Sequence, residues 1–429
     1  MHRVRHTLFT VLFLTLSVSA VFCQEPPLTT APAADKTASP TFFLRNGDRI
    51  AFYGDSITAQ RLYTNQVEDF VLTRYPSLNV TFFNAGVNGD MVTGGRAGKM
   101  KTRVDRDLLP DRPTVVTIML GMNDGRYTTA FKSNFAVYAA GYRKLLDRIK
   151  AGLPNARITL IEPSPYDEIS RPSKIPGYND VLLRYGQFVA TTAQQQGMQV
   201  VDFNHPLTQA LRVGMLLNPS LASLLIPDHI HPSESGHWIM AAALMRAWGA
   251  SPIVSSVSLD GMNATLQNSQ NTDVTALKKT ATGLSWEQED MALPLPLYLS
   301  DPMTQFLLKI SDLATMDQQM LRVQHLRAAS YTLTIDDRKV ASFTRQELAD
   351  GVNLALYETP MLHQAWKVDD DTDNQAALDR AHFLLITTRQ QSPDVAAAAG
   401  IVQSLEYEMA AEQHEDAQPK LHAFELAAN

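Results

Sequence analysis

Alternating strand and helix patterns between residues 41 and 250 constrain the fold of this 429-residue chain more than any other feature. Thr114 to Leu120 is a continuous β-branched and apolar run, which is typical of a strand buried on both faces of a parallel sheet. Repeated β-α-β units predict a parallel sheet covered by helices on both faces, with ligands bound at the carboxyl ends of the strands. The other expected strands are 49–53, 80–84, 157–161 and 199–202, and the expected helices are 64–74, 131–151, 179–196 and 232–248.

The pattern changes after Pro252. Residues 251–345 contain short alternating runs such as Tyr331 to Ile335, which predict a β-rich accessory region. A helix is expected over 302–326, where it interrupts the strands. Only the part of the chain before this change is therefore expected to form the α/β sheet.

Residues 346–429 are predicted to be mainly helical, with two helices expected from Asp373 onward and a break between them at Ser392-Pro393. A final strand is expected over 421–426. The acidic run 369–371 is expected in a solvated loop. Whether the accessory regions form one domain or return to pack on the catalytic sheet is left open by the sequence.

The N-terminus reads as a secretory signal peptide over residues 1–23. It begins with a basic segment, continues with an apolar run and ends with small residues, so cleavage after Ala20 or after Cys23 is expected. An uncleaved membrane anchor and lipidation of Cys23 are the alternatives. Residues 24–40, rich in Pro, Thr and Ala, are expected to be a flexible linker. The protein is therefore predicted to be exported to the periplasm or the extracellular space.

Charge and cysteine content exclude several classes of partner and site. The formal net charge of −7 argues against nucleic acid or an anionic membrane as the main partner. Cys23 is the only cysteine, so neither an intrachain disulfide nor a cysteine-based zinc site is available. No stable membrane insertion is expected after signal cleavage.

Four separated segments carry reactive or polar side chains near the ends of predicted elements. Parallel neighbours would bring them to one rim of the sheet. Ser56 follows the first strand in Gly-Asp-Ser-Ile-Thr, where a turn can direct its hydroxyl towards a substrate. The other three are Asn84-Ala85-Gly86, Gly121-Met122-Asn123-Asp124 and Asp228-His229-Ile230-His231.

These residue types suit acyl transfer. His231 can remove the proton of the Ser56 hydroxyl and return it to the leaving alcohol. Asp228, three positions earlier, can orient the imidazole and stabilise its cation. An oxyanion hole is expected to form from the backbone N–H groups of Ser56 and Gly86 and the side-chain amide of Asn123. One such donor typically lowers the activation barrier by ~3–4 kcal/mol.

The four blocks resemble the SGNH, or GDSL-type, esterase and lipase family of serine hydrolases. The matching residues are Ser56, Gly86, Asn123 and His231, within residues 48–250. The resemblance implies a flavodoxin-like sheet and hydrolysis of carboxylic esters through an acyl-enzyme, with neither a cofactor nor a metal.

Neighbouring residues have simpler interpretations. Asp55 is expected to support the nucleophile turn, and Asn84 to brace the second block. His229 and His237 are interpreted as a neighbour and a packing residue, although their spacing with His231 also allows a metal site. The glycine-rich stretch 86–98 lacks a nucleotide-binding fingerprint.

Substrate class is the least constrained prediction. Export and a β-rich accessory region favour short acyl, mainly acetyl, esters on carbohydrate, with small-molecule esters also open. A lipase or lysophospholipase is the enzymatic alternative, and a catalytically silent glycan-binding or surface-interaction protein is the alternative of another class. Trp286, Tyr298 and Trp366 are candidates for a sugar platform or for core positions. Oligomeric state is not predicted.

Overall fold

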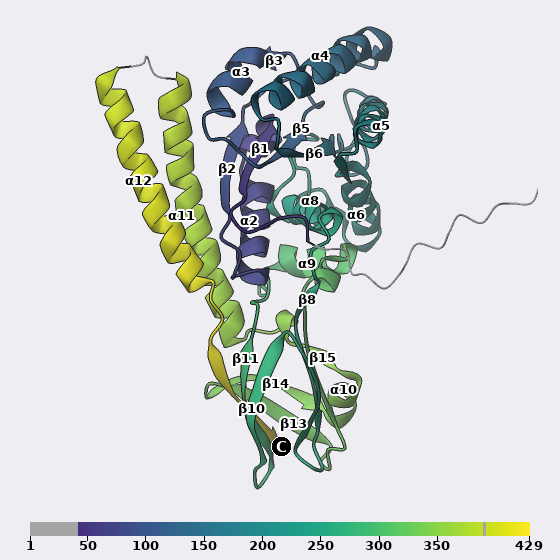
Figure 1. Ribbon diagram of the computed structural model, residues 1–429. Helices are drawn as coiled ribbons and strands as arrows, with labels where there is room; N and C mark the ends of the chain where they lie inside the picture. Colours follow the sequence, from purple (N-terminus) through teal and green to yellow (C-terminus); the bar gives the residue numbers. More distant parts are fainter. Residues whose placement is uncertain (1–41, 389–391) are drawn as a thin grey trace, which may run out of the picture. The chain divides into compact units, whose positions relative to one another are not determined.

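The computed structural model describes residues 42–388 and 392–429 (Figure 1). Residues 42–429 form one compact unit. The predicted signal peptide and linker lie outside the described residues, so both stay predictions.

A five-stranded parallel sheet lies at the centre of the first half of the chain (Figure 1). The strand order is β2-β1-β5-β6-β7, which is the flavodoxin-like order when these strands are numbered along the chain. The predicted fold class is therefore confirmed. The strands are β1 (Arg49–Gly54), β2 (Thr81–Gly86), β5 (Val115–Met119), β6 (Arg157–Glu162) and β7 (Gln199–Asp202).

Helices cover both faces of this sheet. Helix α8 packs on both α2 and α6, and α4 packs on both α3 and α5. Every residue of β5 is buried, as its apolar sequence predicts for a central strand. The long helices are α2 (Leu62–Arg74), α3 (Met100–Asp107), α4 (Phe131–Gly152), α5 (Tyr178–Gln196), α6 (Asn204–Leu217) and α8 (Glu234–Ala247). The short elements are α1 (Ser56–Ala59), β3 (Gly94–Gly95), β4 (Gly98–Lys99) and α7 (Pro219–Ala222).

Two further sheets follow residue 252. Their orders are β10-β11-β16-β13-β14 and β15-β12-β8-β9, and the last strand of the chain is central in the first of them. The first sheet consists of β10 (Thr272–Lys279), β11 (Gly283–Asp290), β13 (Ser330–Ile335), β14 (Arg338–Thr344) and β16 (Leu421–Ala428). The second consists of β8 (Ile253–Asp260), β9 (Thr265–Gln270), β12 (Gln318–Gln324) and β15 (Val352–Asn353).

The helix predicted over 302–326 is only partly correct. It divides into α9 (Pro302–Ile310), a 3₁₀ turn η1 (Leu313–Met316) and strand β12. In β12 the buried Gln319, Leu321 and Val323 alternate with more exposed residues, which is the pattern of a half-buried strand. Two short elements complete this region, α10 (Arg345–Asp350) and η2 (Leu354–Leu356).

Two long helices form a hairpin before the final strand. Helix α11 (Pro360–Thr388) packs on α12 (Pro393–Asp416) and also on α2, α3 and the free edge of β2. The C-terminal region thus returns to the catalytic sheet before β16 pairs with β11 and β13 in the other five-stranded sheet. The acidic run 369–371 lies inside α11, so its assignment to a solvated loop was wrong.

The three aromatic candidates for a sugar platform are separated. Trp286 is buried and stacks on Phe424 at a centroid distance of 5.1 Å, so it belongs to the core. Tyr298 is 42% exposed and stacks on Trp366 at 5.4 Å. Only the Tyr298–Trp366 pair therefore lies near the surface.

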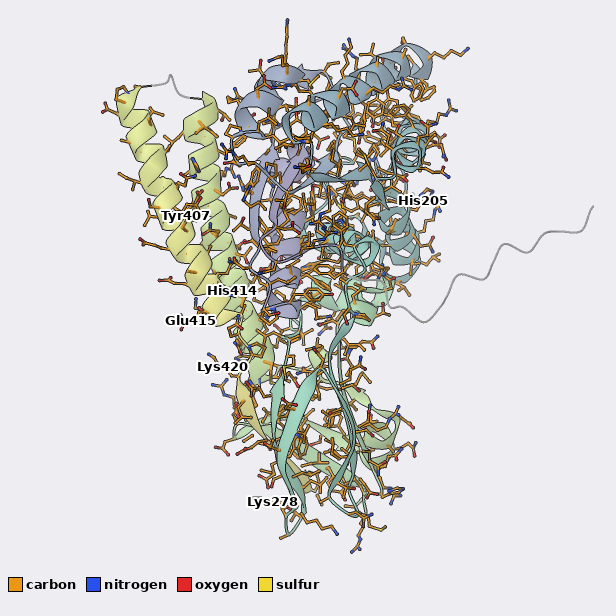
Figure 2. The ribbon with its side chains drawn as sticks, in the orientation of Figure 1. His205, Lys278, Tyr407, His414, Glu415 and Lys420 are labelled. Carbon is orange, nitrogen blue, oxygen red and sulfur yellow. The ribbon has the colours of Figure 1, made fainter. Side chains whose placement is uncertain are left out.

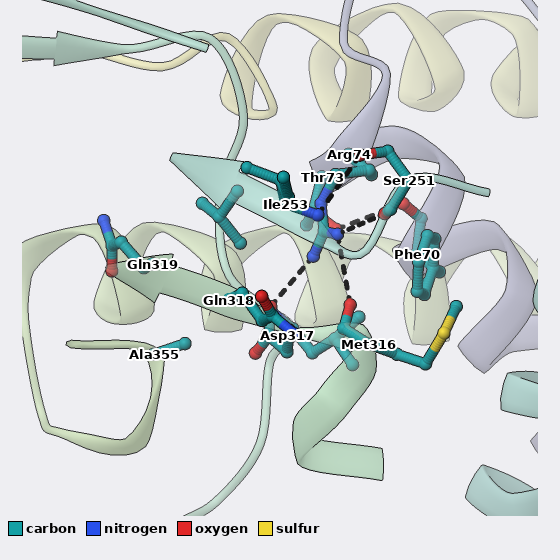
Figure 3. A network of polar contacts seen from close by, with 12 residues as sticks. Phe70, Thr73, Arg74, Ser251, Ile253, Met316, Asp317, Gln318, Gln319 and Ala355 are labelled. Atoms are coloured by element: carbon teal, nitrogen blue, oxygen red, sulfur yellow. Dashed lines mark hydrogen bonds and ion pairs between the residues drawn. The ribbon is translucent and has the colours of Figure 1, made fainter. Parts of the chain in front are cut away.

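A buried ion pair joins α2 to the start of the C-terminal region (Figure 3). One guanidinium nitrogen of Arg74 lies 2.8 Å from Asp317 Oδ1. The other donates to the carbonyl oxygens of Ser251 and Met316, at 2.7 and 3.1 Å. The last residue of α2 thus fixes the point where the chain leaves the catalytic sheet.

In the described part of the chain, no helix has both the length and the apolar character needed to cross a bilayer.

Candidate active site

The nucleophile turn follows strand β1, which lies between β2 and β5. Ser56 is the first residue of α1, and the preceding Asp55 caps this short helix by accepting the Ile57 N–H at 3.0 Å. Asp55 is buried, and this burial, reinforced by the charge of nearby Asp90, raises its pKa to about 7. Asp55 therefore stabilises the turn that carries Ser56.

Serine, histidine and aspartate form one continuous chain of hydrogen bonds. Ser56 Oγ lies 2.8 Å from His231 Nε2, and His231 Nδ1 lies 2.7 Å from Asp228 Oδ2. The second oxygen, Oδ1, accepts the backbone N–H groups of Ile230 and His231, at 2.9 and 2.7 Å. One carboxylate thus shapes the loop and orients the ring within it.

The charge state of Asp228 suits this arrangement. Partial burial raises its pKa, but the hydrogen bonds from the backbone and ring of His231 outweigh this effect and hold the pKa below the usual range. Asp228 is consequently ionised at neutral pH and can stabilise a positive charge on the imidazole.

A second histidine–aspartate pair shows that a spacing of three residues is enough to join the two side chains. His205 Nδ1 lies 2.5 Å from Asp202 Oδ2, again three residues apart, after the edge strand β7 (Figure 2). Asp202 Oδ1 also accepts two backbone N–H groups, those of Asn204 and His205. Within the described residues no serine hydroxyl bonds this ring. The contact with Ser56 therefore distinguishes His231, and the local turn does not.

The other two histidines are occupied elsewhere. His229 Nδ1 bonds the carbonyl oxygen of Asp167 at 2.6 Å. His237 is buried, accepts the Tyr63 N–H at 3.0 Å, and has its pKa lowered to about 3 by burial. Across residues 42–388 and 392–429, no cluster of His, Cys, Asp or Glu is arranged to hold a metal ion.

Gly86 does not present the free N–H that was predicted for it. Its N–H donates to Asn84 Oδ1 at 2.9 Å, in a buried position. A side chain at residue 86 would place its Cβ only 2.4 Å from the backbone nitrogen of Ala59. The predicted oxyanion role therefore needs correction, because Gly86 serves the close packing of β2 against α1.

Gly89 is the residue that the sequence argument missed. It is exposed and has a φ of +72°, and a Cβ added to it would meet no atom within 4 Å, so it borders open space. No acceptor among the described residues bonds its N–H. The Asn88-Gly89 pair, a strong turn signal, was available in the sequence and marks this position.

Asn123 lies beside the same turn. Its side-chain nitrogen donates to the carbonyl oxygen of Asp90 at 3.1 Å, and its oxygen accepts the Tyr127 hydroxyl at 3.0 Å. An amide nitrogen carries two hydrogens, so one donor remains for a ligand. The backbone N–H of Ser56, at the start of α1, likewise has no acceptor within the described residues.

Buried charged residues stabilise the end of β2, which contains Asn84 to Gly86, and the turn that follows it. Arg103 is fully buried, lies 3.0 Å from Asp90 Oδ2, contacts Asp107 and donates to the carbonyl oxygen of Ala85 at 2.7 Å. Asp124 accepts the Val92 N–H at 3.1 Å, and burial raises its pKa to about 8. Two contacts thus hold the turn that contains Gly89: the ion pair of Asp90 with Arg103, and the hydrogen bond that Asp124 accepts from the Val92 N–H.

Comparison with known proteins places this site in a recognised domain. Residues 52–239 match the model of the GDSL-like lipase/acylhydrolase family. An acetylxylan esterase of Geobacillus stearothermophilus is 27% identical over 229 residues, which cover 48% of this chain and 95% of that protein. A solved gut microbial diltiazem-metabolizing enzyme is 22% identical with a TM-score of 0.80, covering 91% of this chain and 100% of that one. The last similarity shows that the arrangement of sheet, β-rich region and helical hairpin recurs in another solved protein.

Proposed function

We propose that the protein hydrolyses ester bonds through the domain over residues 52–239, which matches the GDSL-like lipase/acylhydrolase family, and that its substrates are short acyl esters, mainly acetyl esters, of carbohydrates. The observation that carries the catalytic assignment is the 2.8 Å contact between Ser56 Oγ and His231 Nε2, with Asp228 behind it. The substrate class is supported by the similarity to an acetylxylan esterase along nearly that protein's whole length.

The proposed reaction has two steps. His231 Nε2 takes the proton of Ser56 as Oγ attacks the ester carbonyl carbon, and the same proton then leaves with the alcohol as the C–O bond breaks. In the second step His231 removes a proton from water, the hydroxide attacks the acyl carbon, and Ser56 regains its proton as the acid leaves. Asp228 stabilises the imidazolium in both steps.

Three donors suit the oxyanion that forms in each step. The backbone N–H of Ser56, the remaining side-chain hydrogen of Asn123 and the backbone N–H of Gly89 have no other acceptor in the described residues. Gly89 replaces Gly86 in this proposal. Donors fixed in this way stabilise a developing negative charge without reorganising during the reaction.

Export through the N-terminal signal remains part of the proposal. Polymeric esters of carbohydrate lie outside the cell, so an exported esterase reaches them directly. Size determination of the mature protein in culture supernatant or periplasm, by intact mass, checks both export and the cleavage position.

Ser56→Ala provides the direct test. Loss of the nucleophile should reduce kcat on p-nitrophenyl acetate and acetate release from acetylated xylan by roughly 10⁴-fold or more, with folding unchanged by circular dichroism. His231→Ala should behave similarly. The matched control is His205→Ala, which removes the other histidine with the same aspartate spacing and should keep full activity.

Substrate chain length separates the alternatives. Faster turnover of long-acyl than of short-acyl p-nitrophenyl esters would move the assignment to lipid esters. Wild-type protein that is folded but neither cleaves any ester nor reacts with a fluorophosphonate would indicate a silent binding protein. Equal activity of Ser56→Ala and wild type would overturn the mechanism.

A further inference from the structure

Helix α11 reaches the nucleophile turn from a part of the chain that the family model does not cover. Asp379 of α11 forms an ion pair with Arg61, which is 318 positions earlier in the sequence. The same carboxylate oxygen, Oδ2, accepts the backbone N–H of Asn84 at 3.3 Å. One side chain of the hairpin therefore contacts both strand β2 and the residue that links α1, which carries Ser56, to α2.

Arg61 occupies a sensitive position in the backbone. It follows α1 by two residues and adopts a φ of 69°, a left-handed conformation that costs energy for a non-glycine residue. Its carbonyl oxygen accepts the Thr64 hydroxyl at 2.8 Å, and the residue is only 9% exposed. The Asp379 contact thus helps to hold a strained link between α1, which carries Ser56, and α2.

Asn84 connects the Asp379 side chain to the residues on both sides of the active site, at α1 and at the end of β2. Its side-chain nitrogen donates to the Thr58 carbonyl at 2.7 Å and to the Thr64 hydroxyl at 3.0 Å, and its oxygen accepts the Gly86 N–H. The nucleophile turn and the end of β2 are consequently connected through one amide. Asp379 anchors this amide through the backbone of the same residue.

The tolerance of this arrangement is small. Gly86 packs so closely on α1 that a single methyl group would lie 2.4 Å from Ala59 N. Any shift between α1 and β2 therefore changes the distance between Ser56 and the Gly89 turn that follows β2. Displacements of about 1 Å can reduce rates by up to about 100-fold in well-organised active sites.

We propose that Asp379 is a positioning residue, which holds the Ser56 turn and the end of β2 at the separation that catalysis requires. The proposal rests on the proposed function, since it concerns the same serine. It gives the C-terminal hairpin a role in turnover, in addition to covering the free edge of β2.

The test compares Asp379→Ala and Asp379→Asn with wild type on p-nitrophenyl acetate, using full-length protein at a temperature where all variants are folded. We expect Asp379→Ala to lower kcat about tenfold with KM changed less than twofold, because binding of a small ester does not depend on the turn geometry. Asp379→Asn keeps an acceptor but loses the charge, and should lower kcat about threefold. The rate of Ser56 labelling by a fluorophosphonate should fall in parallel with kcat.

Asp373→Ala is the matched control. Asp373 also lies on α11 and accepts an α2 side chain, Asn65 Nδ2 at 3.0 Å, but it touches neither Arg61 nor Asn84. Its loss should leave kcat and the labelling rate unchanged. If Asp379 had only a structural role, the two Asp379 variants would have lower melting temperatures, and kcat of the folded enzymes would equal that of wild type.

Three outcomes would overturn the proposal: kcat of Asp379→Ala within twofold of wild type, an equal loss in Asp373→Ala, or a change confined to KM. If Asp379→Ala does not fold, Asp379→Asn decides, and wild-type kcat in that variant overturns the proposal. Inactive wild-type protein would instead overturn the proposed function, so the two failures are distinguishable.

Discussion

Helix α2 is joined to the C-terminal region at two places, and their electrostatics are opposite. At its end, Arg74 meets Asp317, and both side chains are almost fully buried, with 1% and 0% exposure. In its middle, Glu68 and Asp69 meet the acidic side of α11 around Asp369, and in the described part of the chain no cation is bonded to either carboxyl group. The stability of the first contact depends on a complete ion pair. The stability of the second depends on whether the carboxyl groups of Glu68 and Asp69 are protonated.

The middle contact is a buried network of neutral donors and carboxyl groups. Asp69 accepts the Thr372 hydroxyl. Burial, followed by the charge of Asp369, raises the pKa of Asp69 well above its usual range. Gln413 of α12 donates to Glu68 at 3.3 Å and to Thr372 at 2.7 Å. Hydrogen bonds from neutral side chains thus stabilise this contact.

Breaking the ion pair should give the largest change in stability. Arg74→Met leaves the buried Asp317 carboxylate without a cation, and leaves the Ser251 and Met316 carbonyls without a donor. We expect the free energy of unfolding, measured by urea denaturation, to fall by about 3–5 kcal/mol.

Replacing both partners is the control for this prediction. The double variant Arg74→Met/Asp317→Leu removes both charges and should recover most of the loss, because apolar residues of similar volume tolerate burial. A loss below about 1 kcal/mol in the single variant would show that water reaches the site, and that the two contacts of α2 differ less than their geometry indicates.

The differences between these contacts explain why the sequence predicts one half of the fold better than the other. The strands of the parallel sheet are apolar and buried on both faces, so Val115 to Met119 could be recognised from composition alone. Helix α3 was missed because its buried face includes Arg103, a residue type that is read as exposed. The acidic run 369–371 was misassigned because its partners do not form a recognisable sequence pattern: Tyr298 donates to Asp369, and Lys367 pairs with Asp371 one helical turn away.

The active site divides in the same way. Side-chain identity and order pointed to Ser56, Asn123, Asp228 and His231 before their distances were known. The proposed choice of Gly89 over Gly86 depends on which backbone N–H is already bonded, and the Gly86 N–H donates to the Asn84 side chain. Sequence patterns carry no information about such local hydrogen bonds, nor about the approach of α11 to Arg61.

The acidic contact should make stability fall as pH rises, and Glu68→Gln tests this. Burial, opposed by the Gln413 hydrogen bond and reinforced by Asp379, raises the pKa of Glu68 to about 8. A raised pKa means that the stabilising contribution is present below about pH 4.5 and is lost as pH rises through about 8. The free energy of unfolding of Glu68→Gln should therefore equal that of wild type near pH 5 and exceed it by about 1–2 kcal/mol at pH 9.

Asp370→Asn is the matched control for the pH effect. Asp370 belongs to the same acidic run but is exposed on α11, so its substitution should leave the pH profile unchanged. If Glu68→Gln and wild type lose stability in parallel between pH 5 and pH 9, Glu68 is not the group that titrates.

The smallest effect is expected at the rim of the acidic contact, where Tyr298→Phe removes one hydroxyl. Tyr298 donates to Asp369 Oδ2 at 3.0 Å while its ring stacks on Trp366, and 42% of the residue is exposed. Burial raises the pKa of Asp369 to about 6, so the hydroxyl supports a carboxylate only above that pH. We expect Tyr298→Phe to lower the free energy of unfolding by about 0.5–1 kcal/mol at pH 8 and by less at pH 5, because hydrogen bonds to charged groups are the stronger ones.

Tyr298→Ala should lose a further ~0.5–1.5 kcal/mol at both pH values, since it also removes the stacked ring. An equal loss for Tyr298→Phe at pH 5 and pH 8 would mean that Asp369 does not change its charge in this range, and the proton-dependent contact would then rest on Glu68 and Asp69 alone.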